Sequence, residues 1–224
     1  MAPTEPIPKP KARVLLVEDH PVVYHGLAML IDDEPDLSVC GGCESAREVI
    51  VLVRKLKPDV VVIDIALGDG NGLDLIKEIH ERDEALPILA LSMHDEAVYA
   101  ERALRAGARG YIMKKEAMDK VMGAIRKVLG GELYISDRMA SRMVTKLISP
   151  KTGANASPVE TLSDREFEVF RMISQGTGPT EMAKRLGVSV KTIETHREHV
   201  KDKLNLKTAA ELTRFALQWA MEHS

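Results

Sequence analysis

Aromatic residues and cysteines are scarce in this sequence of 224 residues, in which phenylalanine, tryptophan and tyrosine together make up 4%. The two cysteines, Cys40 and Cys43, have the C-x-x-C spacing found in some redox and zinc sites. A redox pair of this kind normally opens a helix, and no second pair or nearby histidine completes a zinc site. We therefore interpret both cysteines as small side chains packed near the end of a strand.

Long apolar runs are absent as well. The longest aliphatic stretch near the middle, residues 60–63, ends at Asp64, whereas a membrane span needs roughly 20 apolar residues. Residues 1–11 contain four prolines and no apolar segment like that of a signal peptide. The sequence therefore predicts a disordered tail over residues 1–11 and a cytoplasmic protein that does not contact a membrane.

The first 130 residues alternate β-branched runs with amphipathic helical patterns. The runs lie at 13–17, 37–41, 59–64, 87–92 and 109–113, and the helical patterns lie near 21–33, 45–56, 71–82, 95–106 and 116–129. Such alternation predicts an α/β fold, and the continuously apolar runs VLLV and VVVI indicate strands covered on both faces. We expect a five-stranded, parallel, doubly wound domain of the flavodoxin-like type over residues 12–130.

The remaining sequence is helical apart from one segment. A helical pattern over 136–148 is followed by 149–160, which is rich in Pro, Gly, Ser and Ala and reads as a linker. We therefore assign residues 131–160 to a helix and linker. Beyond them, helical patterns near 163–174, 179–186, 190–204 and 207–220 predict an all-α domain of four helices over 161–224.

Polar and charged residues follow the strands of the predicted sheet. Glu18 and Asp19 follow the first strand, Asp64 ends the third, Ser92 ends the fourth, and Lys114 follows the fifth. Ligands of open α/β sheets bind at the carboxyl ends of the strands. We therefore expect these five side chains to meet at one edge of the sheet.

Three carboxylates held close together repel one another, and a hard divalent cation offsets that repulsion. Mg²⁺ prefers oxygen ligands and usually keeps several waters. The cation and an ammonium group would neutralise the oxygens of an incoming phosphoryl group, and a carboxylate can attack that group to form an aspartyl-phosphate. The cluster therefore predicts phosphoryl transfer assisted by Mg²⁺.

The segments VLLVEDHP, VVVIDIALGDGNG, ALSMHDE and AGARGYIMKK resemble the receiver domain of bacterial response regulators. The resemblance covers residues 12–130 and implies that Asp64 accepts a phosphoryl group from a histidine kinase. It further implies that the Mg²⁺ ligands are Glu18, Asp19, Asp64 and the backbone carbonyl of Ala66.

Three other positions match residues that contact or sense the phosphoryl group in receivers. Ser92 matches the hydroxyl that turns toward it, Lys114 matches the lysine that pairs with it, and Tyr111 matches the aromatic that changes rotamer on activation. Lys115 is the alternative to Lys114 for this role. Side chains alternate along a strand, so the two lysines point to opposite faces, and the spacing from Tyr111 favours Lys114.

The C-terminal region contains signals of a helix-turn-helix. Ser163 and Glu166 have the spacing of a capping box that begins a helix. Pro179 occupies the first turn of a short helix, Gly187 follows that helix, and Ser189 caps a longer one. A short helix, a tight glycine turn and a longer helix are typical of a helix-turn-helix.

The near-neutral chain, with a net charge of −3, contains a basic segment. Between residues 182 and 207, seven basic residues stand against three acidic ones, which gives +4. A localised basic segment is expected where a protein binds nucleic acid phosphates. Along the longer helix, Ile193, Val200 and Leu204 fall on one face and should point toward the core.

The segment LSDREFEVFRMISQGTGPTEMAKRLGVSVKTIETHREHVKDKLNLKTAAEL resembles the LuxR-type helix-turn-helix of NarL/FixJ response regulators over 161–220. The resemblance implies base contacts from Lys191, Glu194 and Thr195. Phosphate or structural contacts are implied for Thr192, Arg197, Lys201 and Lys203. One departure is the sequence Gly-Pro-Thr at 178–180, which replaces a usual Ser-Asn-Lys, so the phosphate contact of that lysine is not carried over.

The last helix places Leu212, Phe215, Ala216 and Trp219 along one side. Two interpretations remain open, packing within the domain and a dimer interface, which the family supports in this region. A dimer would let two recognition helices reach half-sites one helical turn apart. We therefore expect these partners: a histidine kinase, double-stranded promoter DNA, RNA polymerase, and a second copy of the chain after phosphorylation.

Two other classes of function compete with a response regulator. A haloacid-dehalogenase-like phosphatase also uses an aspartate nucleophile and Mg²⁺, but it typically carries D-x-D, and here Asp64 is followed by Ile65 and Ala66. A DNA-binding protein regulated without phosphate is the third class, and the complete set of five receiver residues argues against it. We expect no enzymatic activity beyond phosphoryl transfer and dephosphorylation at Asp64.

Overall fold

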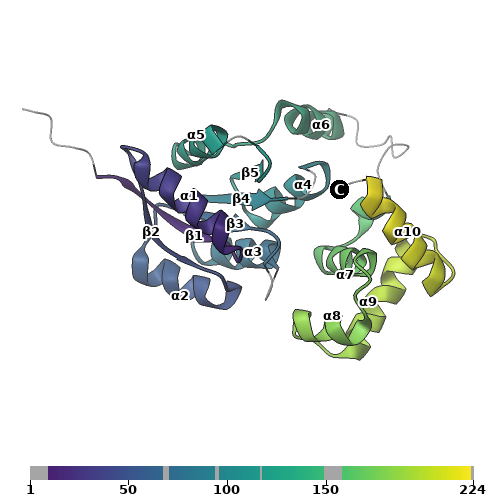
Figure 1. Ribbon diagram of the computed structural model, residues 1–224. Helices are drawn as coiled ribbons and strands as arrows, with labels where there is room; N and C mark the ends of the chain where they lie inside the picture. The colour runs from purple at the N-terminus through teal and green to yellow at the C-terminus, as the bar shows by residue number, and fades with distance from the viewer. Residues whose placement is uncertain (1–9, 68–70, 94–95, 117, 149–157, 223–224) are drawn as a thin grey trace, which may run out of the picture.

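The computed structural model describes residues 10–67, 71–93, 96–116, 118–148 and 158–222. Residues 1–9 of the predicted tail and residues 149–157 of the predicted linker lie outside the described residues. Five strands form one parallel sheet in the order β2-β1-β3-β4-β5 (Figure 1). These strands are β1 (Ala12–Val17), β2 (Leu37–Cys43), β3 (Val60–Asp64), β4 (Ile88–Ser92) and β5 (Gly110–Met113).

Helices cover both faces of the sheet (Figure 1). One face packs against α1 (Pro21–Asp33) and α5 (Met118–Leu129), and the other packs against α2 (Ala46–Leu56), α3 (Gly72–Arg82) and α4 (Glu96–Ala106). Successive residues of β3 belong to different cores, since Val62 lies in the cluster with α1 and α5 and Ile63 lies in the other. The predicted doubly wound parallel fold is confirmed, and the unbroken apolar runs are explained by the two buried faces.

The edge strand β2 contains an irregularity at the cysteines. Val14 pairs with Val39 and Leu15 pairs with Gly41, so Cys40 is an extra residue in a β-bulge. Cys43 is buried, Cys40 is half-buried, and the two are not joined by a disulfide bond. The strand continues to Cys43, two residues beyond the predicted end, because the pairing with β1 resumes after the bulge.

The C-terminal half is helical, as predicted. After α6 (Asp137–Ile148) and a short 3₁₀ helix (Pro158–Thr161) come α7 (Asp164–Ser174), α8 (Pro179–Leu186), α9 (Val190–Lys203) and α10 (Ala209–Glu222). The α7 helix begins with the predicted capping box, in which Ser163 and Glu166 exchange side-chain-to-backbone hydrogen bonds. Gly187, in the left-handed conformation, ends α8, and Ser189, in the β region, caps the start of α9.

The apolar side of α10 packs within its own domain. Leu212, Ala216 and Trp219 are buried, and the Trp219 ring makes edge contacts with Phe167 and Phe170 of α7. This packing supports the first of the two interpretations for these residues.

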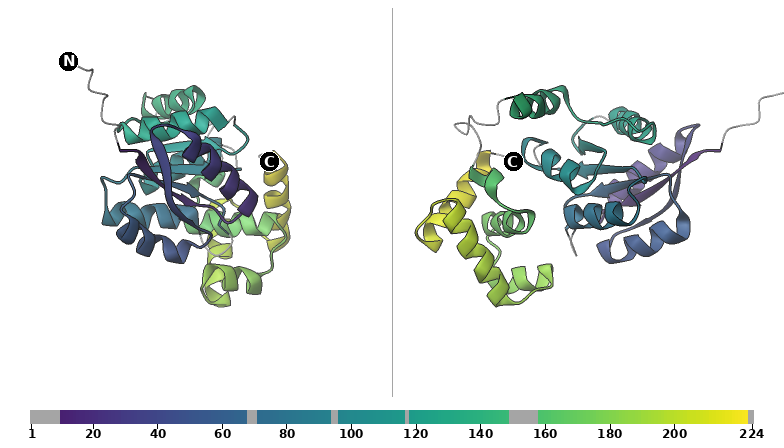
Figure 2. Two further views of the ribbon diagram at one scale, coloured as in Figure 1. Left: turned by 60° about the vertical axis from the view of Figure 1, so that its left-hand side comes forward. Right: turned by 180° about the vertical axis from the view of Figure 1, so that it is seen from behind.

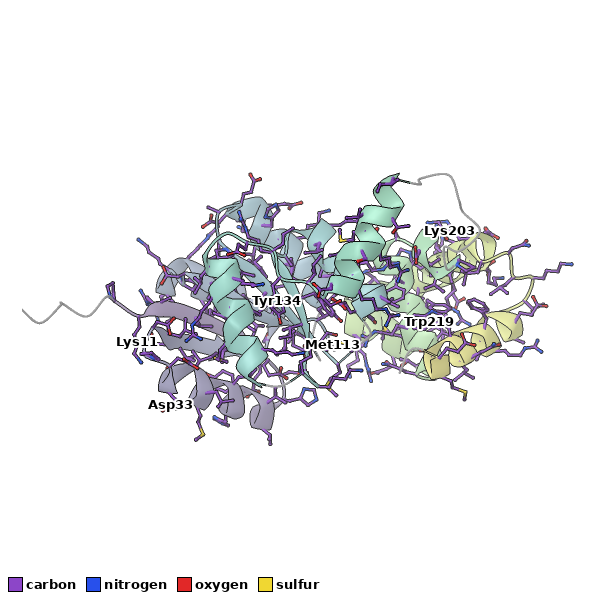
Figure 3. The ribbon with its side chains drawn as sticks, turned by 90° about the horizontal axis from the view of Figure 1, so that it is seen from above. Lys11, Asp33, Met113, Tyr134, Lys203 and Trp219 are labelled. Atoms are coloured by element: carbon purple, nitrogen blue, oxygen red, sulfur yellow. The ribbon has the colours of Figure 1, made fainter. Side chains whose placement is uncertain are left out.

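The carboxyl ends of the strands point toward the C-terminal half (Figures 1 and 2). Lys11, just before β1, lies at the far end of the molecule, whereas Met113, at the end of β5, lies near the C-terminal helices (Figure 3). The sheet edge that carries the predicted site therefore faces the helical domain. No helix in the described part of the chain has both the length and the apolar character of a membrane span.

Candidate functional site

Asp64 lies at the end of β3 with only 1% of its surface exposed. Its Oδ2 accepts a hydrogen bond of 2.8 Å from Lys114 Nζ, and its Oδ1 accepts one of 3.1 Å from the backbone N–H of Ala66. Both carboxylate oxygens are thus held in a fixed direction at the sheet edge. Lys114, rather than its neighbour, is the lysine that the structure brings to Asp64.

Glu18 and Asp19 lie beside Asp64, as the strand order predicts. Glu18 is 1% exposed, and its Oε2 lies 2.6 Å from Lys114 Nζ. His20 Nδ1 lies 2.7 Å from Asp19 Oδ1 and 3.2 Å from Glu18 Oε1. One ligand atom from each of Glu18, Asp19, His20 and Asp64 can be chosen so that all lie within 4.8 Å of one another.

The donor set suits a hard divalent cation. Two of the carboxylates, Glu18 and Asp64, are buried and share one ammonium group, that of Lys114, so the described side chains leave negative charge uncompensated. Carboxylate oxygens are the ligands that Mg²⁺ prefers, and a bound cation would neutralise this charge. Glu18, Asp19 and Asp64 are therefore the residues that can hold it.

Lys114 is half-buried as a residue, and only 7% of its side chain is exposed. Burial acts to lower the pKa of Lys114, but the hydrogen bonds to Asp64 and Glu18 outweigh it and raise the pKa above its ordinary value. A raised lysine pKa means that the charged form is favoured by folding. The stabilisation is fully present below the unfolded pKa and is lost as pH rises through the folded pKa. The ammonium therefore remains charged at neutral pH.

Replacing Lys114 by alanine is expected to lower the free energy of unfolding by about 3 kcal/mol without metal, because two buried carboxylates lose their cation. Adding Mg²⁺ should recover part of this loss, since the metal compensates the same charge. Urea denaturation with chelator and with Mg²⁺ measures both effects. Lys115→Ala is the matched control, because Lys115 is exposed and should unfold like the wild type; equal effects of the two variants would contradict the arrangement.

The register of the sheet places Ser92 beside Asp64 and Tyr111 one strand farther on, where it pairs with Ala90 of β4. Asp64 pairs with Leu91, so Ser92 is the next residue along the neighbouring strand, and Ser92 pairs with Met113. Ser92 is fully buried, and its carbonyl accepts the backbone N–H of Lys114 at 2.7 Å. Tyr111, on β5, is 1% exposed.

Gly72 is a site residue that the sequence reasoning did not single out. A Cβ atom at this position would lie 2.5 Å from the carbonyl oxygen of Asp64 and 2.6 Å from Ile65 Cα. Both neighbours are backbone atoms, so they cannot move aside without shifting the end of β3. Asn71 caps α3 at the same point, because its Oδ1 accepts the N–H of Leu73. The sequence Asn-Gly was the available signal of this close turn.

Replacing Gly72 by alanine is expected to destabilise the protein by roughly 1–3 kcal/mol through overpacking against backbone. Gly26→Ala in α1 is the control, because a Cβ there meets no atom within 4 Å. Alanine in that helix interior should instead stabilise by about 0.5–1 kcal/mol. Urea denaturation of both variants separates the two, and equal stabilities would contradict the close approach at Gly72.

The helix α9 presents a polar stripe to solvent. Ile193 and Val200 are fully buried and Leu204 is 9% exposed, which anchors the opposite face as predicted. Lys191, Glu194, Thr195 and Glu198 are exposed. This is the arrangement expected of a helix that enters the major groove.

Several of the predicted DNA contacts of α9 also take part in contacts within the domain. Thr192 Oγ1 lies 2.8 Å from Ser189 Oγ at the helix start, and Thr195 Oγ1 donates to the Lys191 carbonyl. Ion pairs join Arg197 to Glu194 at 3.3 Å and Lys201 to Glu198 at 2.8 Å. Such i,i+3 pairs orient the cations along the helix surface.

Lys203 is tied to the start of α7. Its Nζ donates to Glu166 Oε2 at 2.6 Å and to the Thr161 carbonyl at 3.4 Å. Burial acts to raise the pKa of Glu166, but the bonds from Lys203 and Ser163 outweigh it, so this pKa lies below its ordinary value. Of the seven α9 residues predicted to meet DNA, Lys203 is thus the one engaged with the capping box.

Comparison with known families matches both halves of the chain. Residues 14–126 match the response regulator receiver domain, and residues 160–216 match the bacterial regulatory proteins of the luxR family. The oxygen regulatory protein NreC of Staphylococcus carnosus is 35% identical over 211 residues, covering 92% of this chain and 97% of NreC. NreC of Staphylococcus aureus is 34% identical with the same coverage.

Solved structures of response regulators match this chain over most or part of its length. RcsB from Salmonella enterica serovar Typhimurium, bound to a promoter with the phosphomimetic BeF₃⁻, has a TM-score of 0.68 at 26% identity. The match covers 92% of this chain and 98% of that one. A LuxR-family response regulator from Aurantimonas has a TM-score of 0.57 at 33% identity, covering 62% of this chain and 99% of that one.

These matches argue against the phosphatase alternative, because the family consists of regulators rather than enzymes that turn over an external substrate. Receiver domains generally bind Mg²⁺, which agrees with the acidic cluster at the sheet edge. The chain belongs to the NarL/FixJ-type two-component response regulators, with a receiver domain followed by a LuxR-type DNA-binding domain.

Proposed function

We propose that Asp64 is the phosphoacceptor and that its phosphorylation by a histidine kinase controls DNA binding by α9. The observation that carries this proposal is the buried Asp64 carboxylate, held by Lys114 and flanked by Glu18. One Asp64 oxygen forms a bond to phosphorus while the bond from phosphorus to the donor histidine nitrogen breaks. The nitrogen keeps the electron pair and takes up a proton.

The residues around Asp64 have separate roles in this transfer. Lys114 Nζ, which already reaches Asp64 Oδ2, is positioned to neutralise a phosphoryl oxygen. The Ala66 N–H, now bonded to Asp64 Oδ1, is a second donor for it. Glu18, Asp19, Asp64 and the Ala66 carbonyl are proposed to hold Mg²⁺, which when bound supplies positive charge to the transferred group.

Ser92 and Tyr111 form the proposed relay away from the site. Ser92 turns toward the phosphoryl group, and Tyr111 changes rotamer and alters the surface formed by α4 and β5. Both residues are buried, Ser92 on the strand β4 that pairs with β3 and Tyr111 on the next strand β5, which supports their assignment. Phosphorylation then shifts the population of two arrangements rather than creating a new one.

The DNA-binding role rests on the exposed stripe of α9. Lys191, Glu194 and Thr195 are proposed to read base edges, and Glu194 can accept from a cytosine amine. Thr192, Arg197, Lys201 and Lys203 are proposed phosphate or supporting contacts. The RcsB relative solved with a promoter makes double-stranded promoter DNA the expected ligand.

We further propose the domain bounds, the cellular location and the partners of the protein. The domains span residues 12–130 and 161–224, joined by a helix and linker over 131–160. The protein is cytoplasmic, forms a homodimer when phosphorylated, and acts on RNA polymerase at the promoter. A face of α10 with Leu217 and Met221 exposed, opposite the buried side, supports a contact with a second copy.

Incubation of the full-length protein with acetyl phosphate and Mg²⁺ tests the proposal. Intact-mass measurement should show a gain of one phosphoryl group that is lost in mild alkali, as an acyl phosphate requires. A modification that survives alkali, or none at all, would contradict an aspartyl-phosphate.

A further inference from the structure

His20 lies beside the acidic residues of the site but has no role in the proposed function. It is the N-cap residue of α1, a position where Ser, Thr, Asp and Asn are preferred because their side chains bond to the first free N–H groups of a helix. The His20 side chain makes no such capping bond. Its Nδ1 instead lies 2.7 Å from Asp19 Oδ1 and 3.2 Å from Glu18 Oε1. The imidazole is therefore directed at the carboxylates rather than at its own helix.

The backbone on either side holds His20 in this place. Its N–H donates to Glu18 Oε1 at 3.1 Å, and its carbonyl accepts the N–H of Tyr24 at 3.0 Å in the first turn of α1. Pro21 restricts the His20 backbone further, because the residue before a proline is biased toward extended conformations. A fixed backbone thus presents the ring to the site, while 66% of the side chain is exposed to solvent.

The distances around His20 resemble those of one metal coordination shell. One ligand atom from each of Glu18, Asp19, His20 and Asp64 lies within 4.8 Å of the others. In an octahedral shell with bonds of about 2.1 Å, neighbouring ligand atoms lie about 3 Å apart and opposite ones about 4 Å apart. The two distances from His20 Nδ1 match neighbouring ligands. A cation that enters the cluster therefore needs only small side-chain movements to reach Nδ1.

An imidazole nitrogen changes which cation such a cluster favours. Mg²⁺ prefers oxygen ligands, whereas imidazole suits transition metals such as iron, nickel and zinc. A nitrogen ligand therefore contributes to the binding of these metals and adds little to the binding of Mg²⁺. The carboxylates alone suit Mg²⁺, and the His20 ring is the group that distinguishes the two kinds of cation.

We infer that His20 Nδ1 is a metal ligand alongside Glu18, Asp19 and Asp64, and that it selects first-row transition-metal dications over Mg²⁺ at this site. The ring binds in the neutral tautomer that leaves Nδ1 unprotonated, so its proton is on Nε2. The inference rests on the proposed function, since the same carboxylates are proposed to hold Mg²⁺. It adds a ligand and a preference, so that a transition-metal dication competes with Mg²⁺ for the cluster.

Proton NMR of the full-length protein with one equivalent of Co²⁺ tests the ligation directly. A histidine bound to Co²⁺ gives a ring N–H signal far outside the ordinary range, and this signal disappears in D₂O. The wild type should show it, and His20→Asn should lack it. Asparagine suits an N-cap, so the start of α1 should keep its structure. His25→Asn is the matched control, because His25 is exposed on the same helix, and it should keep the signal.

Calorimetric titration measures the Kd for Co²⁺ and, by competition, the Kd for Mg²⁺. His20→Asn is expected to raise the Kd for Co²⁺ by about tenfold or more, a loss typical of metal sites deprived of a supporting group. The Kd for Mg²⁺ should change by less than about twofold, because Mg²⁺ gains little from imidazole. The ratio of the two Kd values separates ligation from a positioning role, since a loosened Asp19 would weaken both cations alike.

Three results would overturn the inference: no shifted N–H signal in the wild type, the same signal in His20→Asn, or equal changes in the Kd values for Co²⁺ and Mg²⁺. If the wild type is phosphorylated at Asp64 with Mg²⁺ in such a case, the proposed function stands without the inference. A wild type that binds neither cation and is not phosphorylated would contradict the proposed function, and the inference would fall with it.

Discussion

Replacing Asp64 by asparagine is expected to abolish phosphorylation by acetyl phosphate completely. The amide has the same shape as the carboxylate, so the end of β3 should keep its packing, but it lacks the nucleophilic oxygen. It also removes one of the three carboxylates proposed to hold Mg²⁺, which weakens the metal site. Intact-mass measurement after incubation with the donor and Mg²⁺ shows the loss directly.

The matched control for this variant is Asp33→Asn. Asp33 is the last residue of α1 and is exposed, and the substitution changes the net charge by the same amount. It should be phosphorylated like the wild type. Undiminished modification of Asp64→Asn would place the acceptor elsewhere and would remove the basis of the proposed function.

Replacing Lys191 by alanine is expected to weaken specific DNA binding by about 1–3 kcal/mol, which is roughly 5- to 150-fold, if this side chain reads a base edge. Lys191 lies at the exposed start of α9, the part of a recognition helix that meets the bases. Because base readout distinguishes sequences, the loss should be larger for the specific site than for unrelated DNA. Fluorescence anisotropy with both kinds of duplex measures the difference.

Lys55→Ala serves as the control for charge. Lys55 is exposed on α2 of the receiver domain, so its loss changes the net charge equally without touching α9. Specific binding should then match the wild type. An equal loss for specific and unrelated DNA in Lys191→Ala would assign this lysine to phosphate contact instead of base readout.

Much of the fold follows from the sequence because its patterns are local. The strands are buried on both faces, and helices such as α7 and α9 have clear caps, at Ser163 and Ser189. These elements begin and end within about two residues of the predicted positions. The meeting of Glu18, Asp64 and Lys114 was also predictable, since strand order fixes which residues share an edge.

The remaining features depend on pairs of residues that are distant in sequence. Arg102 and Asp164 are 62 positions apart, and each reads in sequence as an ordinary charged residue on a helix. Whether Lys203 faces DNA or Glu166 depends on how α9 packs on α7, which no periodicity in either helix specifies. The need for glycine at 72 likewise comes from the approach of α3 to the end of β3.

The position of Asp64 at the domain interface gives the proposed control of DNA binding a physical basis. The sheet edge that carries the carboxylates faces the helical domain (Figure 1). Asn71 Nδ2 donates a hydrogen bond from that edge to Glu168 Oε2 of α7. A change at Asp64 therefore has a short path to α7 through bonded and packed groups. The polar stripe of α9 is exposed in this arrangement.

Footprinting of genomic promoter fragments by the full-length protein, with and without acetyl phosphate and Mg²⁺, tests the central claim most directly. Protection should appear at a lower protein concentration after phosphorylation, and Asp64→Asn should show no such shift. Protection at the same concentration with and without the donor, in a protein shown by mass to be phosphorylated, would contradict control of DNA binding by Asp64.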